Sequence, residues 1–113
     1  MVTTPQQVAV SDVRRSIHMF RKVGVPILGI VENMSYLKCQ HCEELTYILG
    51  SGGGEQIAAE LQAPLLGKIP IEPRICTGGD MGQPMPIAEP NSLVAQVFMQ
   101  IATALDATFS TRN

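Results

Sequence analysis

The sequence lacks residues and segments that several large classes of protein need. It has no tryptophan, two tyrosines and three phenylalanines in 113 residues, so stacking on nucleic-acid bases is not expected. Its formal net charge of −2 argues against binding of nucleic acid or of an anionic membrane surface. No apolar run approaches the roughly 20 residues of a membrane span, and a signal peptide is missing. We therefore expect a cytoplasmic protein that binds neither nucleic acid nor a membrane.

Charged residues and cysteines are also scarce. Charged side chains are 16% of the chain, below the ~25% that is typical of soluble domains, which indicates surface that something else covers. Three cysteines, an odd number without a secretory signal, argue against a disulfide framework and favour thiol or metal chemistry. Hydrophobic residues make up 45% of the sequence, enough for the core of a single unit over residues 1–113.

Two stretches have the apolar spacing of amphipathic helices. The first follows Thr4, Pro5 and Gln7, which have the order of a capping box, and ends at Gly24. The second follows Asn91 or Ser92, either of which can cap a helix. The expected buried faces consist of Val10, Val13, Ile17 and Phe20 in the first helix and Val94, Val97, Phe98, Ile101 and Leu105 in the second.

Apolar runs between these helices are typical of buried strands. Val25–Val31 and Pro64–Ile69 are nearly unbroken, and Met1–Thr4 is a further candidate. A short helix over Glu55–Leu61 separates the two runs. Strands that alternate with helices predict an α/β fold with a parallel sheet and helices on both of its faces. Residues Pro70–Asn91, which are rich in glycine and proline, are expected to form a long loop.

The segment Tyr36–Gly50 departs from this pattern and carries the strongest chemical signal. It is a polar excursion that contains Cys39 and Cys42, and two thiolates at this spacing can hold one metal centre within a tight turn. Zinc and iron–sulfur sites usually have four ligands, so two more are needed. A second copy of the chain could supply them, or else Cys76 with His18 or His41. A thioredoxin-type redox pair and an incidental pair of thiols are the alternatives.

Other segments give weaker signals. Ser51–Glu55 and Gly67–Lys68 contain glycines but lack the Lys-Ser/Thr and the spacing of a phosphate-binding loop, so the first is expected to be a flexible helix entry. Asn33 stands at the carboxyl end of a buried strand, where ligands bind in open α/β sheets, and it is either a turn former or a ligand-binding residue. No set of residues suited to a catalytic triad or to paired carboxylates stands out, so no catalytic residue is predicted.

Taken together, these motifs resemble the Mrp/ApbC family of iron–sulfur cluster carrier ATPases, which are related to the MinD-type P-loop NTPases. The matching segments are Val2–Gln6, Val31–Ser35, the Cys39–Cys42 pair, Gly52–Glu55, Gly67–Pro70 and Arg74 with Gly78–Asp80. Asn33-Met34-Ser35 combined with the CxxC pair is fairly specific to that family, and the resemblance extends from Val2 to about Leu105.

The resemblance implies a partial MinD-like parallel sheet with flanking helices and a CxxC knuckle over about residues 36–50. Cys39 and Cys42 would bind a [4Fe-4S] cluster that bridges two subunits of a homodimer and is passed to apo iron–sulfur proteins. Asn33 would lie beside the adenine of ATP, with Ile69, Pro70 and Pro73 on the other side of the base.

The resemblance also implies that this chain is the C-terminal half of the NTPase domain. The glycine-rich Walker A loop and the magnesium-binding and switch aspartates of the family are missing from its 113 residues. Hydrolysis of ATP by this chain alone is therefore not expected. A zinc knuckle that mediates dimerisation or interaction without catalysis is the alternative function, with zinc in place of the cluster.

Overall fold

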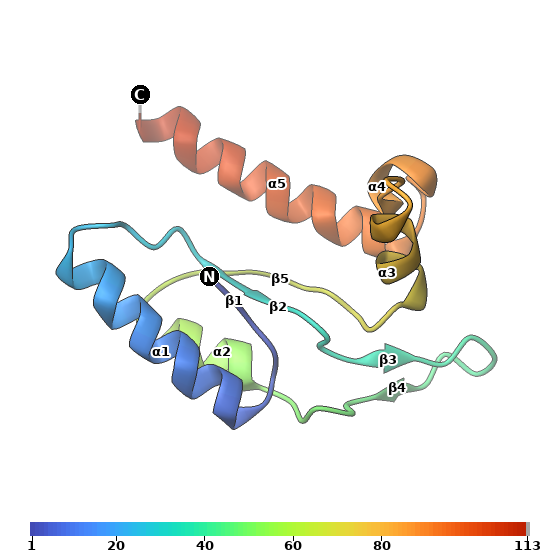
Figure 1. Ribbon diagram of the computed structural model, residues 1–113, viewed down its shortest axis with the longest axis horizontal. Coiled ribbons are helices and arrows are strands. Elements are labelled where there is room, and N and C mark those ends of the chain that lie inside the picture. Colours follow the sequence, from blue (N-terminus) through green and yellow to red (C-terminus); the bar gives the residue numbers. More distant parts are fainter. Residues whose placement is uncertain (113) are drawn as a thin grey trace.

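The computed structural model describes residues 1–112. Over these residues the chain forms a three-stranded sheet, a separate hairpin and five helices (Figure 1). The elements in chain order are β1 (Val2–Thr3), α1 (Gln7–Lys22), β2 (Ile30–Glu32), β3 (Leu37–Lys38), β4 (Leu45–Thr46), α2 (Gly53–Glu60), β5 (Leu65–Lys68), α3 (Pro73–Asp80), α4 (Met85–Ala88) and α5 (Leu93–Arg112).

The sheet has the order β1-β2-β5, and both pairs of neighbours are parallel, as predicted. The prediction of a strand over Val25–Val31 was too long, because β2 begins only at Ile30. The hydrogen bonds of this strand start where Gly29 accepts from the amino group of Met1 and Ile30 donates to Pro64. Pro26 also has no N–H to donate to a ladder, so strand pairing does not extend back over the apolar run.

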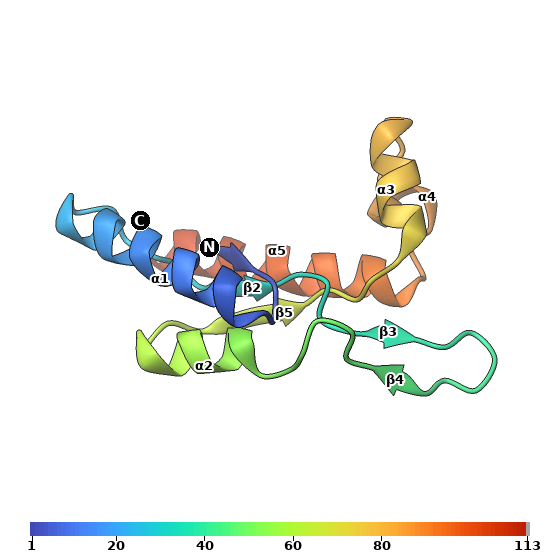
Figure 2. The same cartoon turned by 60° about the horizontal axis from the view of Figure 1, so that its bottom comes forward.

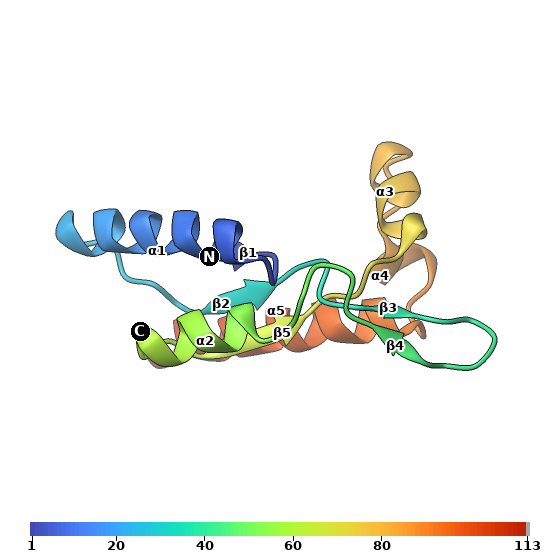
Figure 3. The same cartoon turned by 90° about the horizontal axis from the view of Figure 1, so that it is seen from below.

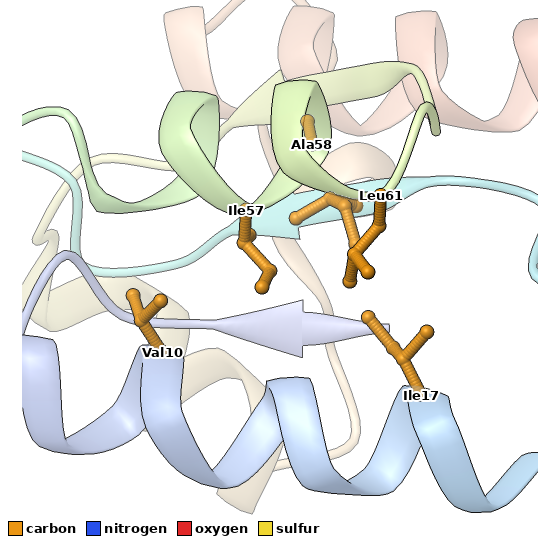
Figure 4. Close-up of a cluster of buried hydrophobic side chains, with 6 residues drawn as sticks. Val10, Ile17, Ile57, Ala58 and Leu61 are labelled. Atoms are coloured by element: carbon orange, nitrogen blue, oxygen red, sulfur yellow. The ribbon is translucent and has the colours of Figure 1, made fainter.

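One face of the sheet packs against α1 and α2. Val10 and Ile17 of α1 and Ile57 of α2 are completely buried, and they point toward one another between the two helices and the sheet (Figure 4). Three further buried residues complete this cluster: Ile30, Ala58 and Leu61. Val10, Val13 and Ile17 of the stripe predicted for the first helix therefore belong to the core on this side, whereas the half-buried Phe20 lies outside this cluster.

The opposite face of the sheet packs against α5 (Figure 1). Val97 and Ile101 of this helix form a second cluster with Ile69, next to the half-buried Val31. Since Ile30 belongs to the first cluster and Val31 to the second, successive residues of β2 face opposite sides of the sheet. Ser92 caps α5 by accepting a hydrogen bond from the N–H of Ala95 at 3.1 Å, which confirms the predicted start of the helix.

The window Leu93–Ser110 of α5 is long and apolar enough, at a mean hydropathy of 1.2, to meet the length and composition of a membrane span. Polar and charged residues such as Gln96, Gln100 and Asp106 interrupt the window, so it contains no long unbroken apolar run. The contacts of α5 with β5 account for the apolar residues on one face of the helix, because a helix that covers a sheet needs such a stripe.

The predicted capping box at the start of α1 was wrong. The helix begins at Gln7 after an extended Gln6, and no side chain caps it. The hydroxyl of Thr4 donates to Oε1 of Gln6 at 3.2 Å and so does not accept from a helix amide. Gly24 does end this region in a left-handed conformation, with φ of 79°, as predicted.

The prediction of a long loop over residues 70–91 was also wrong, because α3 and α4 lie there. The side chain of Glu72 accepts from the N–H of Arg74, and Pro73 occupies the first turn, which is a favourable start for a helix. Gly78 lies so near the main-chain oxygen of Gln83 that a Cβ atom would approach it to 2.6 Å. The lack of a side chain at Gly78 therefore permits close packing between α3 and the chain at Gln83. The helix α3 lies away from the sheet and beside α4 (Figure 2).

Candidate metal centre and the adjoining pocket

The CxxC excursion forms an antiparallel hairpin that projects from the end of the sheet (Figure 3). Its strands β3 and β4 pair Leu37 with Thr46 and Lys38 with Leu45. At its tip, the N–H of Cys39 donates to the oxygen of Glu44 at 2.9 Å, and the N–H of Glu43 donates back to Cys39 at 3.0 Å.

The thiols are free and accessible at this tip. Cys39 is half-buried and Cys42 is exposed, whereas the exposed Cys76 belongs to α3. Across residues 1–112, no three histidine, cysteine, aspartate or glutamate side chains are grouped closely enough to hold a metal ion. A four-ligand site built within one chain from Cys76 and a histidine is therefore not assembled in this structure.

The surroundings of Cys39 favour its thiolate form. Hydrogen bonds from the main-chain N–H of Cys42 and then of His41, with a contribution from the Cys42 side chain, lower the pKa of the Cys39 thiol. The thiolate is both the nucleophile and the metal ligand. The hairpin turn therefore favours the thiolate form of Cys39, which both nucleophilic attack and metal binding require.

We expect the metal-free protein to be alkylated at Cys39 with a pH midpoint below the ~8.5 of an ordinary cysteine thiol. Because deprotonation is favoured in the folded turn, the rate at neutral pH should exceed that of the unfolded chain. The rate of iodoacetamide modification, followed at this residue by peptide mass spectrometry across a pH series, measures the midpoint. The same series in denaturing urea is the control, and equal midpoints in the two states would contradict the prediction.

A largely apolar pocket of about 300 Å³ lies at the carboxyl end of β2 and β5. It is lined by Asn33, Met34, Pro70, Ile71, Glu72, Pro73, Ile75 and Cys76. Three of the four residues predicted to flank adenine thus come together here. The fourth, Ile69, does not line the pocket, since its side chain is only 6% exposed and packs in the cluster under α5.

Met34, Ile71 and Ile75 also line the pocket and were not among the residues predicted to flank adenine. Met34 has a left-handed backbone with φ of 52°, and its N–H donates to Oδ1 of Asn33 at 2.9 Å, so the chain turns sharply after β2. The sequence contained a signal for Ile71, because this residue directly follows the Gly67–Pro70 motif at the end of the strand predicted over Pro64–Ile69. Ile75 gave no such signal, because the helix that carries it was taken for a loop.

The segment Pro70–Glu72 separates this pocket from a second cavity of about 210 Å³. Cys39 and Arg74 are among the residues that line the second cavity. The guanidinium of Arg74 contacts the carboxylates of Glu72 at 2.6 Å and Glu89 at 2.7 Å, and its hydrogen bond lowers the pKa of Glu72. One stretch of chain therefore forms a wall of both the apolar pocket and the cavity beside the CxxC turn.

One known protein family matches most of this chain. A model of the ParA family, described as NUBPL iron-transfer P-loop NTPase, matches residues 1–106. The chain belongs to this family. The match confirms the family resemblance found in the sequence, which rested on the CxxC pair and the segment that contains Asn33.

Two curated relatives of this chain are named as iron–sulfur cluster carrier or transfer proteins. The chain is 42% identical over 106 residues to an iron-sulfur cluster carrier protein of Helicobacter pylori, a match that covers 94% of this chain and 29% of the relative. It is 44% identical over 102 residues to the iron-sulfur cluster transfer protein NUBPL of Dictyostelium discoideum, covering 90% and 32%. The chain thus spans about a third of the length of these relatives.

Solved structures agree with the family assignment. A nucleotide-binding protein of Archaeoglobus fulgidus, in complex with ADP, is 31% identical with a TM-score of 0.65, over 80% of this chain and 37% of that one. The septum site-determining protein MinD of Pyrococcus horikoshii, complexed with Mg-ADP, gives a TM-score of 0.75 at 24% identity, over 99% and 43%. The fold is therefore that of the MinD-like P-loop NTPases, as predicted.

Proposed function

We propose that this chain is the cluster-holding part of an iron–sulfur cluster carrier. The observation that carries the proposal is the pair of free thiols, Cys39 and Cys42, at the tip of a hairpin that projects from the α/β body. A labile cargo must be accessible to the protein that receives it, and a projecting tip allows this. The names of the relatives, which are carrier and transfer proteins, support the same conclusion.

The cargo in this proposal is a [4Fe-4S] cluster shared by two chains. Each chain offers two thiolates, and a twofold axis through the site brings four together from one repeated surface. Iron–sulfur clusters of this type take four cysteine ligands, so the homodimer completes the set. The recipients are apo iron–sulfur proteins, and cytoplasmic localisation stays a prediction.

Metal and sulfide analysis of anaerobically purified protein, with a visible spectrum, tests this function. A cluster predicts a brown protein with charge-transfer absorption, and iron and sulfide at about two atoms of each per chain. Colourless protein with about one zinc per two chains would indicate the alternative zinc-knuckle dimer. Insulin-reducing activity with a Cys39–Cys42 disulfide would indicate a thiol oxidoreductase instead.

We propose further that the pocket beside β2 takes the adenine end of a nucleotide. Asn33 offers amide donors and acceptors for the edge of a base, and Pro70 and Pro73 offer rigid apolar surface for its face. The ADP complex of the 31% identical relative supports this assignment. Pocket residues Met34, Ile71 and Ile75 add apolar contacts to those proposed from the sequence.

The chain by itself should hydrolyse ATP no faster than a blank preparation. Its sequence contains no Walker A loop, so it has no residues known to surround the phosphates or to hold magnesium. Release of phosphate from ATP and magnesium by the purified chain measures the rate, and a preparation of the chain with Asn33→Ala is the control for contaminating ATPases. Turnover above the blank that Asn33→Ala removes would contradict the prediction.

A further inference from the structure

Glu32 is a charged residue in an unusual place, because only 1% of it is exposed. It lies two residues after Ile30 on β2, and so its side chain points to the face of the sheet covered by α2. Buried carboxylates need hydrogen-bond partners, and both oxygens of Glu32 have one. Oε2 accepts from the hydroxyl of Ser35 at 2.5 Å, and Oε1 accepts from the N–H of Gly54 at 2.8 Å.

These two partners stand at the two ends of the CxxC excursion. Ser35 is the last residue before the chain leaves for Tyr36 and β3, and Gly54 lies in the first turn of α2, where the chain has just returned. One carboxylate therefore joins the outgoing and the incoming end of the segment that covers residues 36–53. A negative charge is also favourable at the N-terminus of a helix, which strengthens the bond to Gly54.

The junction itself is buried, and a cavity of about 340 Å³ adjoins it on the side of Tyr47 and Lys68. Ser35 is 2% exposed, and a Cβ atom on Gly54 would come within 2.9 Å of the Glu32 side chain. The main chain adds two bonds on the outgoing side, from the N–H of Ser35 to Ile69 at 2.9 Å and from the N–H of Ile71 to Tyr36 at 2.7 Å. On the incoming side, Lys68 of β5 pairs with Glu55 in the first turn of α2, and Glu32 is the side chain that bonds to both sides of the base of the hairpin.

We propose that Glu32 is a positioning residue that clamps both ends of the hairpin and thereby sets the direction in which the two thiols are presented. The proposal rests on the proposed function, because it concerns how the same cysteines reach the cluster. Binding a cluster between two chains requires both hairpins to arrive in one geometry. A base that is closed by a buried carboxylate lowers the number of orientations that each hairpin can adopt before binding.

Three variants separate this role from a general loss of stability. Ser35→Ala removes the hydroxyl that joins the outgoing end to Glu32. Glu32→Gln keeps both ends joined, because its amide oxygen can accept from Gly54 and its amide nitrogen can donate to the Ser35 oxygen. Val10→Ala, in the cluster between α1 and α2, should lower the free energy of unfolding at least as much without touching the hairpin.

Two measurements on the full chain give the readout. The first is the affinity for zinc ions, by competition with a chelator under reducing conditions, and the second is hydrogen exchange of the hairpin amides of Cys39 and Glu43 in metal-free protein. We expect Ser35→Ala to bind zinc about 10-fold more weakly and to exchange faster at both amides. Glu32→Gln and Val10→Ala should stay within about twofold of the wild type in both measurements.

The outcomes distinguish the clamp from the function on which it rests. Unchanged hairpin exchange in Ser35→Ala, or an equal change in Val10→Ala, would overturn the clamp. Faster hairpin exchange with unchanged zinc affinity would overturn its role in presenting the thiols. A wild-type chain that holds no iron and sulfide after anaerobic purification, while Ser35→Ala still frees the hairpin, would overturn the proposed function and leave the clamp as a structural device.

Discussion

We expect a chain with both Cys39→Ser and Cys42→Ser to bind no metal and no cluster, and not to form the proposed cluster-bridged dimer. The two thiolates are the soft ligands of the hairpin tip, and serine hydroxyls do not replace them. The loss should therefore be complete rather than partial. Helix content should not change, because the tip packs against neither of the two buried clusters.

Iron, zinc and sulfide per chain, together with molar mass and circular dichroism, check this result. Cys76→Ser is the matched control, since it removes one exposed thiol on α3 and should keep metal content and molar mass at wild-type values. The opposite pattern, in which the Cys76 variant loses the metal and the double variant keeps it, would show that the site is assigned wrongly.

The variant Gly53→Ala should be less stable than the wild type by about 1–3 kcal/mol. Gly53 begins α2 against the loop between β1 and α1, and an added Cβ atom would lie 2.4 Å from the main-chain oxygen of Pro5. The contact is with backbone rather than with a flexible side chain, so α2 or the loop would have to shift. Urea unfolding of the metal-free protein measures the free energy of unfolding.

Gly79→Ala is the control for the intrinsic preference of alanine over glycine in a helix. Gly79 lies in α3 with nothing within 4 Å of the position of a Cβ atom, and alanine there should stabilise the chain by up to about 1 kcal/mol. Both variants replace glycine by alanine, but the free energy of unfolding should fall in the Gly53 variant and rise in the Gly79 variant. A Gly53 variant as stable as the wild type would show that the α2 entry is not closely packed.

The two Gly-rich segments show where local sequence rules fail. Residues 70–91 were expected to be a loop because of their glycines and prolines, yet Pro73 starts a helix and Gly78 lets that helix approach Gln83. The glycines at the start of α2 were expected to be a flexible entry, yet Gly53 and Gly54 are buried against Pro5 and Glu32. In both places glycine is used for close approach, and only the packed neighbour shows it.

The contacts of Glu32 were not predicted for a related reason. A signal existed, because Glu32 is two residues after Ile30 and a strand places both on the same side of the sheet. A charged residue on a face that is otherwise apolar indicates a buried hydrogen-bonding role. Its partners could not be named, because Gly54 is 22 residues away and meets it only after the hairpin returns.

The sequence by itself determined the parallel α/β order, the buried faces of α1 and α5, the family and the CxxC pair. Periodic burial and short motifs are local properties, and the chain encodes them within a few residues. Only the tertiary structure decided which residues of the pocket meet, since Ile69 turns into the core while Ile71 and Ile75 line the cavity. It also decided that one buried carboxylate joins both ends of the hairpin, because contacts between distant segments depend on how the sheet and helices pack.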